Sequence, residues 1–167
     1  MSTLKCLCAI TLLSVLFSSC KTIDDDRIPP VAVNIVFTTD GVWDRYGVSG
    51  AKTHRNFIRT SNIKEPSDFP FTANTFTGYG GVLLVGDMFG EAVAYDLACP
   101  YEVKPDVRIV VDNDAADAYC PVCGSTYDIF MGNGHPTSGP AADRGYGLTR
   151  YRVYKGDGLL NYRVISR

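Results

Sequence analysis

The chain has little of several features that would point to a particular function. Its 167 residues include two histidines and one tryptophan, and its acidic and basic side chains nearly balance, at a formal net charge of −2. A near-neutral chain gives no reason to expect a basic face for nucleic acid or an acidic disordered tail. We find no phosphate-binding loop, no Ser–His–Asp set, no paired catalytic carboxylates and no regular aspartate spacing for calcium.

Length and turn-forming residues indicate one domain rich in β-structure. A chain of 167 residues is long enough for one domain with a real core and too short for two comfortable ones. Sixteen glycines, nine prolines and ten tyrosines favour a turn-rich β protein over a helical bundle. No internal repeat or low-complexity segment interrupts the chain.

The first 30 residues are expected to lie outside this domain. Residues 1–19 carry one basic residue, an apolar run and two final serines, which is typical of a secretory signal peptide and too short for a spanning helix. Residues 16–20, Leu-Phe-Ser-Ser-Cys, resemble a lipoprotein cleavage site, although that pattern prefers an aliphatic residue where Phe17 stands. Cys20 would then be lipidated and anchor the protein. The alternative is an ordinary secreted protein with a chance cysteine.

Residues 20–30 are expected to be a tether that contains the acidic run Asp24 to Asp26 and ends in two prolines. The acidic run is most simply solvated, and it also resembles the signal that directs Bacteroidetes lipoproteins to the cell surface. The expected location is the outer membrane, on its periplasmic face or at the cell surface. The expected partners are the membrane and an envelope protein, without nucleic acid.

Residues 31–167 carry a pattern of short strands separated by turns. Apolar or alternating runs predict strands at 31–37, 82–85, 91–97, 107–111, 115–119 and 124–128, and a closing hairpin at 148–165. A short helix is expected near Thr53 to Thr60. Turns or loops are expected around Asp40 and Asp44 and over residues 131–141. The sequence therefore predicts an all-β domain, a small sandwich or barrel.

Three cysteines of this domain lie in two short Cys-Pro turns. Cys99 follows one predicted strand, and Cys120 and Cys123 follow another. Cys120 and Cys123 have the spacing of a thioredoxin-type redox pair, but a turn into a strand follows them rather than the helix that such a pair requires. A structural zinc ribbon would need a second Cys-x-x-Cys, which the chain lacks.

The second turn resembles a cluster-binding loop of the Rieske iron–sulfur domain. It reads Cys-Pro-Val-Cys-Gly-Ser-Thr-Tyr-Asp over residues 120–128 and is followed by Gly-Pro-Ala over 139–141. Ala-Cys-Pro-Tyr over residues 98–101 resembles the first loop of that family, which carries Cys-x-His. The resemblance covers residues 78–167 and implies a Rieske-like fold with two opposed cysteine loops.

The family holds one iron of its cluster with two thiolates and the other with two imidazoles. The resemblance gives the thiolate positions to Cys99 and Cys120, and the imidazole positions to Tyr101 and Cys123. Neither of the latter is histidine, and His135 matches no ligand position.

Two further sets of family positions also have counterparts in this sequence. Lys104 and Val122 replace the cysteines that brace the two loops by a disulfide in many members. Ser125 and Tyr127 match the residues that hydrogen-bond the cluster.

Three outcomes are open for the thiols. Cys99, Cys120 and Cys123, with or without Tyr101, could hold an atypical 2Fe–2S cluster of low potential. They could hold zinc, completed by Tyr101, His135 or water. Two of them could instead form a disulfide, the ordinary outcome outside the cytoplasm.

The start of the chain bears on this choice. Exported cluster proteins usually carry a twin-arginine signal, and residues 1–5 contain no arginine. We therefore expect a non-enzymatic structural or interaction module without a standard Rieske cluster and without a cofactor. The alternative is an electron-transfer protein with an atypical cluster, or a zinc site.

Overall fold

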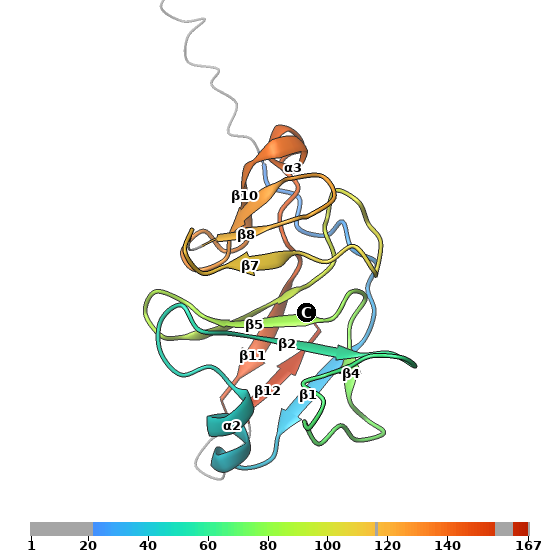
Figure 1. Cartoon of the computed structure of the whole chain (residues 1–167), viewed down its shortest axis with the longest axis vertical. Helices are drawn as coiled ribbons and strands as arrows, with labels where there is room; N and C mark the ends of the chain where they lie inside the picture. Colours follow the sequence, from blue (N-terminus) through green and yellow to red (C-terminus); the bar gives the residue numbers. More distant parts are fainter. Residues whose placement is uncertain (1–21, 116, 156–161, 167) are drawn as a thin grey trace, which may run out of the picture.

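The computed structural model describes residues 22–115, 117–155 and 162–166, and these form two antiparallel sheets with two short helices (Figure 1). The larger sheet has the strand order β3-β2-β5-β6-β11-β12-β1-β4. Its strands, in that order, are Lys64–Glu65, His54–Arg59, Val82–Gly86, Ala92–Asp96, Arg150–Tyr154, Tyr162–Ile165, Val33–Phe37 and Phe76–Thr77. The prediction of an all-β domain is confirmed.

The second sheet has the order β10-β9-β8-β7 and lies with helix α3 at the upper end of Figure 1. Its strands, in that order, are His135–Ser138, Thr126–Asp128, Asp117–Tyr119 and Val110–Asp112. The helices are α2 (Asp40–Tyr46), at the opposite end of the molecule, and α3 (Gly139–Arg144). No described helix is long and apolar enough to cross a membrane.

The larger sheet curls on itself, so that strands far apart in its order meet. The backbone N–H of Arg59 on β2 donates to Thr77 Oγ1 on β4, at 3.1 Å, although five strands separate β2 from β4 in the sheet. Both end strands, β3 and β4, are two residues long. The curl encloses one hydrophobic core inside the sheet and leaves the outer face of β5 and β6 for the second sheet.

Strand β5 is buried on both faces because it separates the two cores. Val82 and Leu84 belong to the core inside the curl, with Phe57 and Phe37. Leu83 and Val85 belong to the second core, which includes Tyr127, Ile129 and the cysteines. A strand that packs on both sides reads as a continuous apolar run rather than an alternating one. This explains why residues 82–85 gave such a clear prediction.

Two local predictions are wrong. The expected helix at Thr53 to Thr60 is strand β2, which pairs with β3 on one side and β5 on the other. The expected turn around Asp40 and Asp44 is helix α2, whose N-cap Thr39 accepts a hydrogen bond from the backbone of Val42. The helix buries Trp43 and Tyr46 against the inner core. Pairing on both sides outweighed the weak helical periodicity of residues 53–60.

The expected loop at residues 131–141 is also more ordered than predicted. It contains strand β10 and the first residues of α3. Other strands are confirmed with shifted bounds, since β7 begins at Val110 and β12 at Tyr162. The predicted signal peptide and Cys20 lie outside the described residues.

The described part of the tether, residues 22–30, lies along the domain rather than extending into solvent. Asp24 forms an isolated parallel bridge with Tyr146, and Ile28 is 4% exposed. Figure 1 shows this blue segment running from α3 down to β1.

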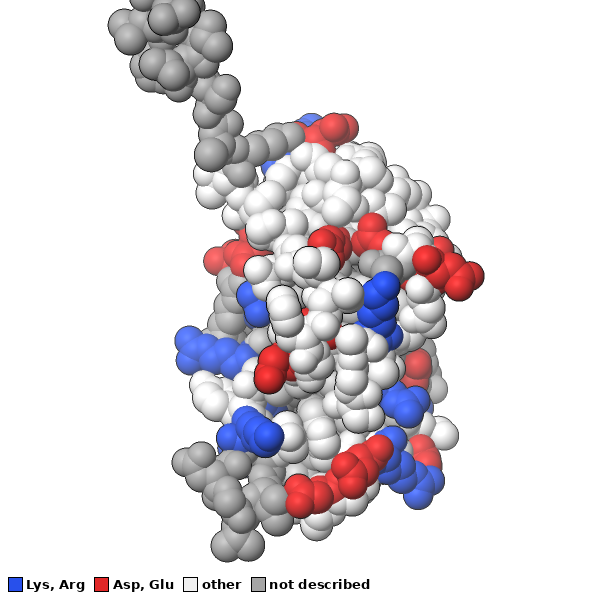
Figure 2. Space-filling view, turned by 90° about the vertical axis from the view of Figure 1, so that its left-hand side faces the viewer, with Lys and Arg blue, Asp and Glu red and all other residues white. Residues whose placement is uncertain are grey.

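The surface that Figure 2 displays carries acidic and basic side chains interspersed over the domain. This arrangement matches the small net charge of the sequence. The described residues on this face therefore offer no extended basic stripe of the kind that tracks a nucleic-acid backbone.

Candidate metal centre

Two short loops at the end of the second core position the three thiols. In the first loop, the backbone N–H of Cys99 donates to Val107 and its carbonyl accepts from Val103, both at 2.9 Å. In the second, Cys120 donates to the carbonyl of Ser125 and accepts from Gly124, again at 2.9 Å. The backbone hydrogen bonds of Cys99 thus close the first loop, and those of Cys120 close the second.

The thiols converge on one point. The Sγ atoms of Cys99, Cys120 and Cys123 all lie within 4.8 Å of one another, and those of Cys99 and Cys123 are 3.7 Å apart. All three are free cysteines. Cys99 and Cys120 are completely buried, whereas Cys123 is partly exposed. This group contains no histidine or carboxylate among the described residues.

The residues behind the second loop fix two of these sulfurs. Cys123 Sγ donates to Ser125 Oγ at 3.3 Å, and Cys99 Sγ lies 3.4 Å from the Tyr127 hydroxyl. Ser125 Oγ also accepts the backbone N–H of Ala141, at 2.9 Å. A Cβ on Gly139 would come within 2.8 Å of the Cα of Ser125, so only glycine allows this close approach. The Gly-Pro-Ala segment therefore supports the second loop.

Asp96, at the end of β6, holds the start of the first loop. Its carboxylate is completely buried and accepts backbone N–H groups from Tyr79, Gly80 and Ala98, and the hydroxyl of Tyr151. The bond from Ala98, at 2.7 Å, comes from the residue directly before Cys99. Sequence reasoning missed Asp96; the available signal was a single carboxylate in an otherwise apolar strand.

The two opposed loops give their thiols different acidities. Burial raises the pKa of the Cys99 thiol to about 12, against the lowering effect of its hydrogen bond with Tyr127. Partial burial also acts to raise the pKa of Cys123. Hydrogen bonds with Ser125, Cys120 and Cys99 outweigh that effect and leave the pKa of Cys123 below its usual value. Of Cys99 and Cys123, Cys123 is therefore both the more accessible and the more acidic thiol.

The remaining predicted ligands lie differently. Tyr101 is 38% exposed, and its ring faces Tyr146 at a centroid distance of 6.5 Å. His135 lies on β10 opposite Asp128 and is exposed. His54 is on β2, half-buried, and lines a separate pocket with Asn113. The two histidines thus lie outside the group of thiols.

These positions decide how well the site fits a standard Rieske cluster. That cluster needs two imidazoles on its second iron. Among the described residues the group of ligating side chains consists of cysteines alone. The donor set therefore does not match the standard cluster, and no step of the proposed function depends on one.

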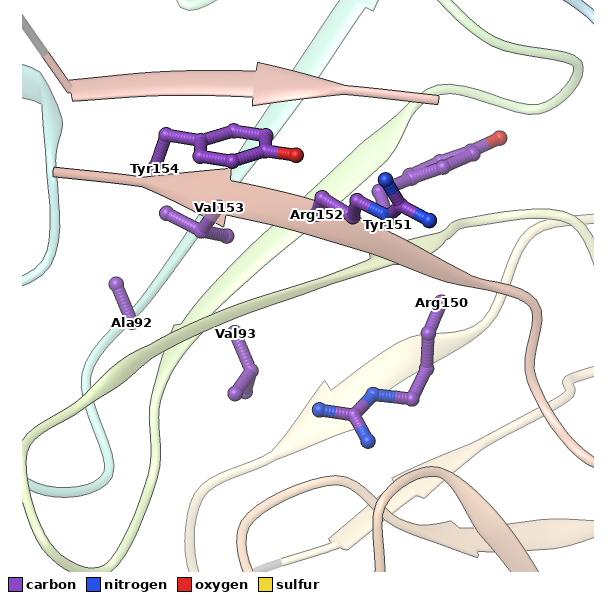
Figure 3. Close-up of a pocket in the computed structure, with 7 residues that line it drawn as sticks. All are labelled: Ala92, Val93, Arg150, Tyr151, Arg152, Val153 and Tyr154. Carbon is purple, nitrogen blue, oxygen red and sulfur yellow. The ribbon is translucent and has the colours of Figure 1, made fainter. Parts of the chain in front are cut away.

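A pocket of about 480 Å³ opens elsewhere, where the pairing of β6 with β11 ends (Figure 3). Its lining comes from these two strands and consists of Ala92, Val93, Arg150, Tyr151, Arg152, Val153 and Tyr154. None of these residues is a thiol, and the pocket does not include the two cysteine loops.

Alkylation should separate the three thiols. We expect iodoacetamide to modify Cys123 in the folded, metal-free protein, because that thiol is partly exposed and its pKa is lowered. Cys99 and Cys120 should react only after unfolding, since both are completely buried. Peptide mass spectrometry of protein labelled with and without urea measures this directly. Equal labelling of all three in the native state would contradict the described geometry.

Comparison of the chain with protein-family models, curated proteins and solved structures finds no match.

Proposed function

We propose that the chain is a non-enzymatic module of the cell envelope, anchored by lipid at Cys20, whose Rieske-like domain binds one soft metal ion through Cys99, Cys120 and Cys123. Zinc is the ion that we expect. The domain then serves as a stable structural or interaction unit for an envelope partner, without a standard cluster.

One observation carries the proposal, namely the spacing of the three sulfurs. Tetrahedral zinc binds thiolate sulfur at about 2.3 Å, which places two sulfurs on the same ion roughly 3.8 Å apart. The Sγ atoms of Cys99 and Cys123 are 3.7 Å apart, and all three lie within 4.8 Å. Small side-chain rotations therefore suffice to put all three on one ion. A water molecule would complete the coordination, since the ring of Tyr101 faces Tyr146 instead.

Burial supports a structural rather than a catalytic role. A catalytic zinc exchanges the water in its fourth position for a substrate, so that position must be accessible from solvent. Here Cys99 and Cys120 are completely buried, and Cys123 is only partly exposed. The second core packs directly around the first two sulfurs. An ion at this site would link the two loops and so replace the bracing disulfide that the resemblance leads one to expect.

Electron transfer through an atypical 2Fe–2S cluster is the second candidate. The contacts of Cys123 Sγ with Ser125 Oγ and of Cys99 Sγ with the Tyr127 hydroxyl favour it. Both hydroxyls could donate to cluster-bound sulfur, and such hydrogen bonds tune the potential of the cluster. Two irons, however, spread four ligands over two metal ions. The compact group of three thiols suits a single ion better.

Metal analysis of the full-length chain, purified in detergent without chelator, tests the proposal. We expect about one zinc per chain, and loss of that zinc in Cys99→Ser and in Cys123→Ser. His135→Ala is the matched control, since His135 lies outside the group, and should keep its zinc. Retention of zinc in Cys123→Ser would contradict the three-thiol site.

Two other results would overturn the zinc proposal in different ways. Brown protein with about two irons and two labile sulfides per chain would establish the electron-transfer candidate. Colourless, metal-free protein in which two of the three thiols resist alkylation until they are reduced would establish a disulfide instead.

A further inference from the structure

The described part of the tether forms a strap across the end of the domain that carries the cysteine loops. The strap comprises residues 22–28 and follows Cys20 directly in the chain. Its contacts fix which end of the domain lies beside the lipid anchor. We propose that the strap holds the cysteine-loop end of the domain facing the membrane surface to which Cys20 attaches.

Backbone pairing attaches the strap at one point. The N–H of Asp24 donates to the carbonyl of Gly145 at 2.8 Å, and the carbonyl of Asp24 accepts from Gly147 at 2.9 Å. One residue further on, the Asp25 carbonyl accepts the hydroxyl of Thr149 at 2.6 Å. Three hydrogen bonds on consecutive residues define a fixed direction for the chain.

Side chains extend the same attachment towards the first cysteine loop. The Arg27 guanidinium lies 4.2 Å from the centre of the Tyr146 ring, a cation–π contact. The ring of Tyr146 also faces Tyr101, in the loop that follows Cys99. Ile28 is 4% exposed, so the strap ends in the packed interior. The strap is thus connected, through Tyr146, with the loop that follows Cys99.

The length of chain between the anchor and the strap sets the distance to the membrane. Asp24 lies four residue steps after Cys20 in the chain. A fully extended chain covers at most about 3.6 Å per residue, so these four span no more than roughly 14 Å. Without the strap, the same anchor would leave the domain free from Cys20 to β1, which begins at Val33. The strap therefore shortens the free chain between Cys20 and the domain, and it sets the orientation of the domain relative to the membrane.

The orientation identifies the surface that meets the lipid headgroups. The second sheet, α3 and the start of the strap lie at one end of the molecule, and α2 lies at the other (Figure 1). Val122, at the turn of the second cysteine loop, is 61% exposed and is available to face the headgroups. Trp43 lies on α2, at the opposite end, so its fluorescence serves as the probe for that end of the domain.

The test measures energy transfer from tryptophan to dansyl-labelled headgroups in vesicles that carry the full-length lipoprotein. Energy transfer from the α2 end is measured with the unmodified chain, in which Trp43 is the only tryptophan. The loop end is read with Val122→Trp, and independently with Arg144→Trp on α3, each combined with Trp43→Phe. We expect strong transfer from both loop-end probes and little from Trp43.

Two variants test the strap itself. Asp24→Pro removes the N–H that donates to Gly145. The domain should then lose its fixed orientation, so the transfer efficiencies of the loop-end probes and of Trp43 should become more similar. Insertion of six residues after Lys21 keeps the strap but lengthens the chain between Cys20 and the strap by up to roughly 20 Å. It should weaken transfer from both loop-end probes.

This inference rests on the proposed lipid anchor, and the experiment separates the two. Mass spectrometry for acyl chains and flotation with vesicles test the anchor alone. A chain without acyl groups that fails to float would refute both the anchor and the orientation. A lipidated, floating chain with equal transfer from Trp43 and the two loop-end probes would overturn the orientation alone. Unchanged signals in Asp24→Pro would overturn the role of the strap.

Discussion

Replacing Asp96 by alanine is expected to lower the free energy of unfolding by about 3–5 kcal/mol. The carboxylate is completely buried, and it accepts hydrogen bonds from the backbone of Tyr79, Gly80 and Ala98 and from the hydroxyl of Tyr151. Alanine leaves all four donors without this acceptor. The N–H groups of Gly80 and Ala98 are buried, so water cannot readily replace the carboxylate there, and each unpaired donor is costly. Urea denaturation followed by Trp43 fluorescence measures the change.

Asp87→Ala provides the matched control. Asp87 also accepts two backbone N–H groups, from Phe89 and Glu91, but in the exposed turn between β5 and β6. Water can replace the lost acceptor there, so we expect a loss of about 1 kcal/mol. Asp96→Ala should also expose Cys99 to iodoacetamide, because Ala98 loses its anchor. Equal destabilisation by the two variants would show that burial of the Asp96 network is not what stabilises the loop.

Phe37→Ala should destabilise the domain by a similar amount, about 3–5 kcal/mol, through the other core. Phe37 is completely buried and contacts Trp43, Phe57 and Phe69 edge-to-face, at centroid distances of 4.9, 5.6 and 5.7 Å. Alanine leaves a cavity among three aromatic rings, which come from β2, from α2 and from the loop between β3 and β4. Urea denaturation monitored by far-ultraviolet circular dichroism is the suitable measurement, because Trp43 itself borders the cavity.

Phe71→Ala is the control for this second prediction. Phe71 is only partly buried and contacts Phe69 at the margin of the same core. We expect a loss of about 1–2 kcal/mol, near the transfer free energy of the side chain alone. In Phe37→Ala, Cys123 should remain the reactive thiol below the unfolding transition, since the aromatic core and the cysteine core lie on opposite faces of β5. A comparable loss in the two variants would argue against a cavity at Phe37.

The sequence predicted those parts of the fold whose pattern is local. Strands β5 and β6 flank a short turn and carry a clear apolar or alternating pattern, so both were predicted nearly to their bounds. Helix α2 could not be recognised so easily, because it spans seven residues and only Trp43 and Tyr46 mark its buried side. Strand β2 has two adjacent buried residues, Phe57 and Ile58, which suit a helix and a strand equally. Pairing with β5 decides between them.

In the candidate site, too, the features with a local sequence pattern were predicted and the contacts between distant segments were not. The resemblance of the two Cys-Pro turns to cluster-binding loops led to the expectation that their thiols lie together, and the three sulfurs do lie within 4.8 Å of one another. Contacts between distant segments were not predictable. Asp24 pairs with Tyr146, and Tyr151 donates to Asp96, and neither residue type signals its partner in the sequence. The contact of Tyr101 with Tyr146 also joins segments that are distant in the sequence.

The two ends of the curled sheet have a consequence for crowding. Copies of a protein anchored in one membrane meet repeatedly in a plane, and an open sheet edge lets neighbouring copies add strands to one another. Here the edge strand β3 consists of Lys64 and Glu65, both charged and exposed. The other edge, β4, is equally short, and Thr77 on it bonds back to β2. We therefore expect the two edges of the larger sheet to resist strand addition between copies of this protein at high concentration.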